Sequence, residues 1–151
     1  MPIEIREIFG IASFMYENLE LGREHYEEIA LNKNIMVFNP DITRFQSIED
    51  QGFLLSVGVF DGAQLVGYTI NIIGAHLHYA DLMCAFNDML YVHPDYRKSG
   101  VGVALINETK RLAKERGVQF MTWHAKENTA LATLLLKLEC KVQDIVFSEE
   151  L

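Results

Sequence analysis

The sequence has few of the residues that mark secreted or membrane-spanning proteins. Its two cysteines, Cys84 and Cys140, cannot form a disulfide framework, and we interpret them as buried apolar thiols in a reducing compartment. The start, Met1-Pro2-Ile3-Glu4, lacks the basic and apolar regions of a secretory signal. Apolar runs such as residues 53–60 are far shorter than the ~20 residues of a membrane-spanning helix. We therefore expect a cytoplasmic protein without a membrane partner.

Positive charge is also scarce. The chain carries 13 Lys and Arg residues against 21 Asp and Glu residues, and its formal net charge is −8. Residues 1–61 hold eleven of the acidic residues and only four basic ones. This distribution disfavours binding to nucleic acid. It leaves two interpretations open, a solvated helical surface or attraction of a cationic substrate.

The remaining composition is that of an ordinary globular protein. Half of the residues are hydrophobic and 23% are charged. The chain has no internal repeat, low-complexity tract or linker rich in proline and serine. Residues 1–151 are therefore predicted to form a single domain.

The first fifty residues are predicted to be helical. Apolar residues recur at about helical spacing over residues 8–19, and a second helix is expected from Arg23 to about Lys33. Residues 39–41 interrupt the pattern with a proline, and a short helix to Asp50 is expected after them.

After Gln51 and Gly52 the pattern changes to strands that alternate with helices. A hairpin turn is expected at Asp61-Gly62, and Gly117 is expected to cap a helix. This order predicts a mixed α/β sheet. The predicted strands are residues 53–60, 65–73, 86–92, 118–124 and 142–147, and the predicted helices are residues 100–116 and a segment that begins at Asn128 or Thr129.

The most informative stretch is the turn that precedes the helix at residues 100–116. It reads Arg97-Lys98-Ser99-Gly100-Val101-Gly102. Glycines let backbone N–H groups approach an oxygen closely, and the start of a helix adds partial positive charge. The turn is thus predicted to cradle a diphosphate, with further positive charge from Arg97 and Lys98.

Two other phosphate-binding motifs fit this turn poorly. A nucleotide P-loop requires Lys and then Ser or Thr after its last glycine, whereas Val103 and Ala104 follow Gly102. A dinucleotide fingerprint requires a third small residue, whereas Leu105 occupies that position.

The turn resembles the cofactor motif Gln/Arg-x-x-Gly-x-Gly/Ala of the GNAT superfamily of acyl-CoA-dependent N-acyltransferases. The preceding residues 90–96 and the helix that opens at Asn128 are also similar to conserved parts of that family. The resemblance covers roughly residues 53–147. It implies the family's α/β (α+β) fold, in which helices flank a mixed, mostly antiparallel central sheet with a splayed pair of strands.

The resemblance also implies a site for acetyl-CoA, with no metal. In the family, a primary amine on a small molecule or protein attacks the thioester directly in a ternary complex, and a backbone N–H near Leu90 or Tyr91 is expected to stabilise the oxyanion. The residues implied to bind the cofactor are Leu90, Tyr91 and Val92 for the pantetheine arm, Arg97, Lys98, Ser99, Gly100, Val101 and Gly102 for the pyrophosphate, and Asn128 near the pantetheine.

An attacking amine with a pKa near ~10.4 needs a general base. Asp88 is the leading candidate because it lies two residues before Leu90 and is expected to be in phase with it along the strand. A carboxylate with a purely structural role at a strand edge is the alternative. His93 and His124 are weaker candidates for the base.

The sequence departs from the family at the residue that donates a proton to the leaving thiolate. Leu135 occupies the place where many members carry a tyrosine, and Tyr91 or Tyr96 is a candidate substitute. A thiol with a pKa of about 8.5 also leaves tolerably without help. A non-catalytic acyl-CoA-binding or interaction module therefore stays open as the alternative function.

Three further expectations concern partners. Only ten residues follow Lys141, and a shortened last strand leaves a sheet edge that favours a homodimer. His76 and His78 lack a convincing third ligand, so no metal site is predicted there. The acidic side chains expected to meet a cationic acceptor are those of Asp41, Glu49 and Asp50.

Overall fold

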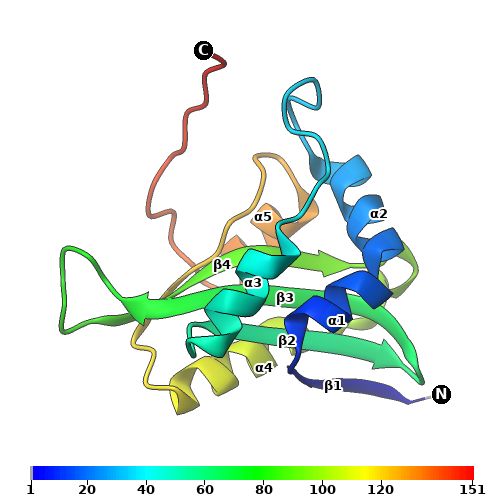
Figure 1. Ribbon diagram of the computed structural model, residues 1–151, viewed down its shortest axis with the longest axis horizontal. Helices are drawn as coiled ribbons and strands as arrows, with labels where there is room; N and C mark the ends of the chain where they lie inside the picture. Colours follow the sequence, from blue (N-terminus) through cyan, green and yellow to red (C-terminus); the bar gives the residue numbers. More distant parts are fainter. Residues whose placement is uncertain (1) are drawn as a thin grey trace.

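A computed structural model describes residues 2–151 and shows one twisted sheet with helices on both of its faces (Figure 1). The sheet has five strands in the order β1-β2-β3-β4-β5. Neighbouring strands are antiparallel except β4 and β5, which are parallel. The elements are β1 (Ile3–Ile8), α1 (Ile11–Glu17), α2 (Leu19–Ile29), α3 (Ile42–Asp50), β2 (Leu54–Asp61), β3 (Gln64–Ala75), β4 (Met83–Val92), the 3-10 helix η1 (Pro94–Ser99), α4 (Val101–Glu115), β5 (Phe120–Thr122) and α5 (Ala130–Lys137).

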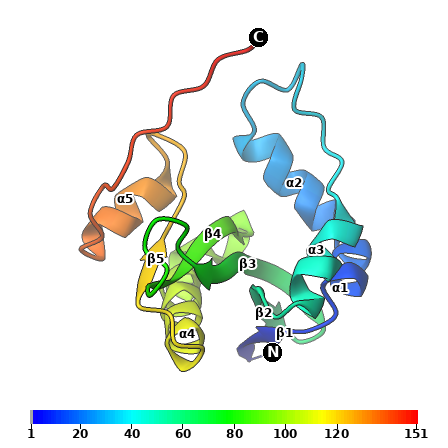
Figure 2. The same ribbon diagram turned by 60° about the vertical axis from the view of Figure 1, so that its left-hand side comes forward.

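Each face of the sheet carries its own apolar core. Helices α1, α2 and α3 lie on one side of the sheet and α4 lies on the other (Figure 2). The two cores explain why β2 reads as a continuous apolar run, since its side chains are buried on both faces. Residues of the α4-side core include Leu55, Val57, Val92 and Leu105, and those of the opposite core include Ile11, Leu54, Tyr68 and Tyr91.

The N-terminal segment differs from the helix-only prediction. Strand β1 pairs with β2 from Ile3 opposite Asp61 to Ile8 opposite Ser56. Its sequence alternates between isoleucine and charged residues at first, which suits a half-exposed edge strand. Helix α1 begins only after Gly10, which has a φ of +73°. Helix α2 begins at Leu19, four residues before the predicted Arg23, and α3 ends at Asp50 as predicted.

The β2–β3 hairpin and helix α4 confirm the local predictions. Gly62 turns the hairpin with a φ of +61°, and Gly117 follows α4 with a φ of +82°. Both are left-handed conformations that glycine adopts without a steric penalty. The mixed, mostly antiparallel sheet with flanking helices is the predicted fold class.

The C-terminal prediction is wrong. The strand expected at residues 142–147 is not formed, and residues 141–151 are exposed and run away from the sheet beyond α5 (Figure 1). The adjacent edge strand, β5, is only three residues long, so it offers few backbone groups for pairing. Within residues 2–151, no helix is long and apolar enough to cross a bilayer.

Candidate functional site

Strands β4 and β5 separate soon after they meet. They pair only at Cys84–Phe120, Ala85–Met121 and Phe86–Thr122. Beyond these pairs β4 runs on to Val92, and none of the described strands pairs with that edge of residues 87–92. This β4–β5 split is the predicted splayed pair, and it leaves backbone groups of Leu90, Tyr91 and Val92 without a strand partner on one side.

A β-bulge in β4 lies at the split. Asn71 of β3 pairs with Asn87 and Ile70 pairs with Met89, so Asp88 is an extra residue in β4. The bulge changes the alternation of side chains, and residues 85 and 92 consequently share the α4-side core. The simple alternation from which Asp88 was expected to be in phase with Leu90 is therefore interrupted at Asp88 itself.

Asp88 is exposed beside the split, although neighbouring atoms partly cover its carboxyl. Loss of hydration through burial raises the pKa of the Asp88 carboxyl, and His124, which follows β5, opposes this rise. Asp88 and His124 therefore lie close enough for the charge of His124 to act on the Asp88 carboxyl. A raised pKa makes a carboxylate a better proton acceptor, which is the property that a general base needs.

The turn at residues 97–102 forms an open junction between η1 and α4. Gly100 has a φ of +80°, and no heavy atom lies within 4 Å of the position that a β-carbon would take. The first hydrogen bond of α4 is donated by the Ala104 N–H to the Gly100 carbonyl over 3.1 Å. The N–H groups of Val101, Gly102 and Val103 lie before this bond, in the turn where a helix has no acceptors of its own. Such a helix start can hold an anion through backbone N–H groups.

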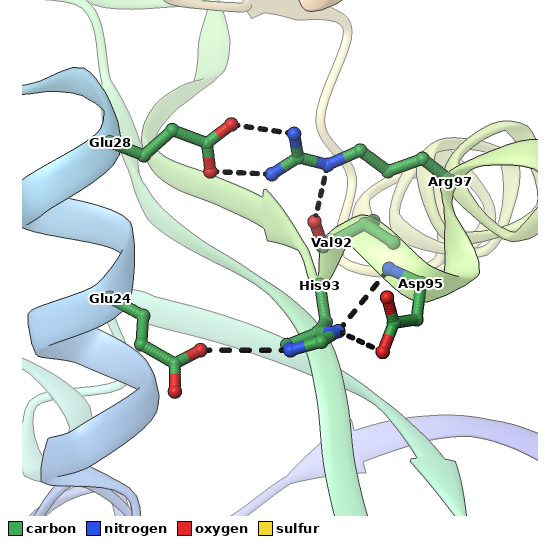
Figure 3. Close-up of polar contacts among 6 residues, drawn as sticks. All are labelled: Glu24, Glu28, Val92, His93, Asp95 and Arg97. Carbon is green, nitrogen blue, oxygen red and sulfur yellow. Dashed lines mark hydrogen bonds and ion pairs between the residues drawn. The ribbon is translucent and has the colours of Figure 1, made fainter.

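The Arg97 side chain forms an ion pair with helix α2. Its guanidinium donates to both carboxylate oxygens of Glu28 in α2, over 2.5 and 2.6 Å, and its Nε donates to the Val92 carbonyl over 2.7 Å (Figure 3). The bond from Arg97 lowers the pKa of Glu28. Arg97 and Lys98 are both exposed, and the charge of Arg97 is paired with that of Glu28.

A second contact joins η1 to α2. His93 Nε2 lies 3.8 Å from a Glu24 carboxylate oxygen, and His93 Nδ1 accepts from the Asp95 N–H over 3.3 Å (Figure 3). His93, a weaker candidate for the base, is therefore held between α2 and η1. Together with the Arg97 bridge, this contact fixes the turn relative to α2.

Sequence analysis missed His25, which is only 7% exposed. Its Nδ1 lies 2.8 Å from the hydroxyl of Tyr68, and its ring stacks on Tyr91 with centroids 4.6 Å apart. Burial lowers the pKa of His25 to about 4, so its ring is neutral at ordinary pH. Its spacing of four residues from Leu21 and Ile29 was the available signal, because this spacing places it on the apolar face of α2.

The two candidate tyrosines lie in different environments. Tyr91 is buried in the core beneath α1 and α2, and burial raises the pKa of its hydroxyl. Tyr96 donates to an Asp61 carboxylate oxygen over 2.7 Å and thereby ties η1 to the β2–β3 hairpin. Tyr96 is thus committed to a structural contact, whereas Tyr91 stays a candidate.

Helix α5 starts after Thr129, which was one of the two N-cap residues predicted for it. Thr129 is the N-cap, and its hydroxyl accepts from the Ala132 N–H over 3.3 Å. Asn128 precedes it, exposed and with a φ of +60°. Leu135 is buried in this helix. The 3.8 Å approach of Leu134 to the β-carbon position of Gly102 shows that α5 lies against the start of α4.

The acidic residues expected to meet a cationic acceptor have hydrogen bonds within the fold. Asp41 accepts from the Arg44 N–H at the start of α3, and Asp50 accepts from Gln46. Glu49 accepts from the N–H groups of Gly10 and Ile11 and so anchors the start of α1. Among residues 2–151, no three His, Cys, Asp or Glu side chains are grouped to hold a metal ion.

An apolar pocket of about 300 Å³ lies between α1, α2, the loop that follows α2, and strands β3 and β4. His25 and Tyr68 line it together with Met89, which is adjacent to Asp88. Lys126, from the loop that follows β5, lines the pocket from the β5 side of the split. The pocket therefore borders both sides of the β4–β5 split.

A family model described as the acetyltransferase (GNAT) family matches residues 10–138. The match spans β2 to β5, the turn at residues 97–102 and helix α5. A comparison with curated protein sequences found no match.

Solved structures with the same fold were found over the whole chain. An aminoglycoside acetyltransferase from an uncultured soil metagenomic sample superposes with a TM-score of 0.79 at 15% identity, covering 100% of this chain and 99% of that one. A ribosomal-protein-alanine N-acetyltransferase from Brucella melitensis gives 0.71 at 19% identity, covering 99% and 98%. AAC(6')-Iy, solved with a bisubstrate analogue that contains CoA, gives 0.65 at 19% identity, covering 99% of each chain.

Proposed function

Because the chain belongs to the acetyltransferase (GNAT) family, whose members are acyl-CoA N-acetyltransferases, we propose that it transfers the acetyl group of acetyl-CoA to a primary amine by direct attack in a ternary complex. The observation that carries this proposal is the open turn at residues 97–102 beside the unpaired edge of β4. Diphosphate and pantetheine are neighbouring parts of coenzyme A, and these two features are neighbours in the fold.

The proposed binding residues divide by the kind of contact that each can make. The N–H groups at the start of α4 and the ammonium of Lys98 would hold the diphosphate. The backbone of Leu90, Tyr91 and Val92 would pair with the amide groups of the pantetheine arm, as an added strand pairs with a sheet edge. Asn128 would contact the arm from the opposite side of the split.

Bound acetyl-CoA supplies an activated thioester, and the chemistry required of the chain is proton transfer. In the proposed reaction the amine nitrogen attacks the carbonyl carbon, the C–S bond breaks, and an amide and a thiol form. Asp88, directly or through a water molecule, takes the proton that the amine loses. A backbone N–H of β4 near Leu90 would stabilise the oxyanion.

Tyr91 is the proposed donor to the departing thiolate. Burial and the nearby Glu28 charge raise the pKa of its hydroxyl, which therefore keeps its proton at neutral pH. Buried Leu135 favours a second candidate function, a module that binds acyl-CoA without catalysis, because a leucine cannot donate a proton.

Measurement of thiol release from acetyl-CoA with a panel of primary amines separates the two functions. For the enzyme, Asp88→Asn should lower kcat/KM by about a hundredfold or more without weakening CoA binding, and Tyr91→Phe should lower kcat. Asp81→Asn, which removes an exposed acid from the β3–β4 loop, is the matched control and should leave the rate unchanged. Tight CoA binding with no thiol release for any amine would refute the enzyme and support the module.

A pH profile tests the identity of the base. Burial raises the pKa of Asp88 above its ordinary value of 3.8, and the base must be deprotonated to act. The wild-type kcat/KM should therefore rise with pH through this raised value, and the same limb should be missing from the Asp88→Asn profile. An unchanged limb in the variant would assign it to another group.

A further inference from the structure

The walls of the apolar pocket contain almost no charge. Of the residues in 2–151 that line it, only Lys126 is charged at neutral pH, because His25 is neutral. An ammonium group that entered this space would lose hydration without gaining a countercharge. Most of the walls are aliphatic or aromatic, including Phe14, Met15, Met36, Phe38, Leu65 and Ile70.

The acidic side chains of α2 do not supply a countercharge, although α2 forms one wall of the pocket. Glu28 is bound to Arg97 and Glu24 faces His93. Glu27 pairs with Lys33 at 3.2 Å. These three acids have partners within the chain, and neither they nor Glu20, the fourth acid of α2, line the pocket. The excess of acidic residues in the N-terminal part therefore adds no negative charge to the walls of this pocket.

The pocket meets the proposed reaction centre at one end. Met89 lines the pocket and follows Asp88 in β4, while Lys126 lies two residues after His124. His25 and Tyr68, which are polar, hydrogen-bond to each other over 2.8 Å. An acceptor in the pocket would thus place its apolar part among the walls and its amine at the split.

We propose that the acceptor is a small primary amine carried on an uncharged, largely apolar body, such as an arylalkylamine, and that this pocket binds the body. The proposal rests on the proposed acetyl transfer and names the acceptor class for it. A volume of about 300 Å³ is at the lower end for ligand pockets, which fits one ring or a short alkyl chain. Polyamines and aminoglycosides would have to bury several charges against Lys126 and the apolar walls.

The test compares acceptors that share a primary amine and differ in the attached body. Phenethylamine is compared with spermidine and kanamycin, each assayed by thiol release from acetyl-CoA. We expect kcat/KM for phenethylamine to exceed that for each polycation at least about tenfold, since even a single methylene in an apolar pocket gives discrimination of this order. Equal or better transfer to spermidine or kanamycin would overturn this acceptor class while leaving the acetyl transfer itself intact.

A charge placed in the pocket wall gives an independent readout. Met36 lines the pocket, lies in the exposed loop after α2, and bonds to Tyr26 only through its backbone carbonyl, so Met36→Glu should fold normally. This variant should lower kcat/KM for phenethylamine about tenfold and raise that for spermidine. Leu77→Glu, at a highly exposed residue of the β3–β4 loop that does not line the pocket, should change neither value.

Calorimetry of phenethylamine with the wild-type protein separates failure of the pocket from failure of the reaction. Binding that Met36→Glu weakens and Leu77→Glu does not would support the pocket, even if no amine were acetylated. Identical binding to both variants, or no binding to the wild type, would overturn the proposal whatever the rate of acetyl transfer to other amines.

Discussion

The bridge between Arg97 and Glu28 joins the candidate cofactor turn to α2, and its strength can be measured by a double-mutant cycle. The two side chains are 37% and 38% exposed, so water and salt screen their interaction strongly. The pair is bidentate but partly exposed, and we expect a coupling free energy of about 0.5–1 kcal/mol between Arg97→Gln and Glu28→Gln. For a chain of this length, that corresponds to a Tm decrease of about 1–4 °C for Glu28→Gln.

Arg97→Gln should lower the free energy of unfolding more than Glu28→Gln does. Arg97→Gln also removes the 2.7 Å bond from Nε to the Val92 carbonyl, which adds about 1 kcal/mol to its cost. Urea denaturation of the wild type, both single variants and the double variant at low ionic strength yields the coupling. A coupling of zero would refute the reasoning that this pair anchors the turn, because the two costs would then simply add.

The cycle has a pH dependence of defined sign and a matched control. Arg97 holds the pKa of Glu28 below its ordinary value of 4.5, so the folded state favours the charged carboxylate. The stabilisation should be complete above that value and should disappear as the pH falls through the lower pKa of the folded state. Glu108→Gln breaks an exposed pair with Arg111 within α4, away from the turn, and should change the Tm less.

Two further predictions concern stability. Asn87→Leu should destabilise the fold by about 1–3 kcal/mol in urea denaturation, because the buried side-chain oxygen Oδ1 of Asn71 loses the donor that Asn87 Nδ2 supplies at 2.9 Å. Asn107→Leu on the exposed face of α4 should have almost no effect, and equal costs for both variants would contradict this assignment. Truncation after Lys141 should change the free energy of unfolding by less than about 0.5 kcal/mol, because the removed residues are exposed. A large fall in Tm, or dissociation of an oligomer in size-exclusion chromatography, would show instead that this segment pairs with another chain.

Local sequence signals predicted the parts of the fold that depend on neighbouring residues. The β2–β3 hairpin follows from alternating or β-branched residues around Asp61-Gly62, and α4 follows from its apolar face and from Gly117 after its end. The same reasoning located the turn at residues 97–102, because Gly100 and Gly102 lie between the strand that ends at Val92 and the apolar face of the following helix. These features need no knowledge of distant partners.

The features that sequence analysis missed depend on distant partners. The bulge at Asp88 is defined only by the pairing of β4 with β3. Arg97 finds its counterion 69 residues away in α2, where the run of acidic residues gave no sign of which one would bind it. His25 is buried because Tyr68 and Tyr91 cover it, and both come from strands.

The two errors at the chain ends have related causes. The isoleucines of β1 alternate with charged residues, and this signal was outweighed by the helical spacing that begins at Ile8. The β-branched residues at 142–147 do favour a strand, but a strand forms only where a sheet edge accepts it. In this fold the adjacent β5 provides three residues of edge.

The most direct test of the account is calorimetric titration of CoA and of pantetheine, which lacks the diphosphate, into the wild type and two glycine variants. Gly100→Val forces a β-branched residue into a φ of +80°, whereas Gly102→Ala adds only an ordinary 3.8 Å contact with Leu134. We predict that the wild type and Gly102→Ala bind CoA far more tightly than pantetheine. We predict that Gly100→Val retains its circular dichroism spectrum but loses CoA binding. Unchanged CoA affinity in Gly100→Val, or equal affinity of the wild type for pantetheine and CoA, would contradict the claim that this turn holds the diphosphate.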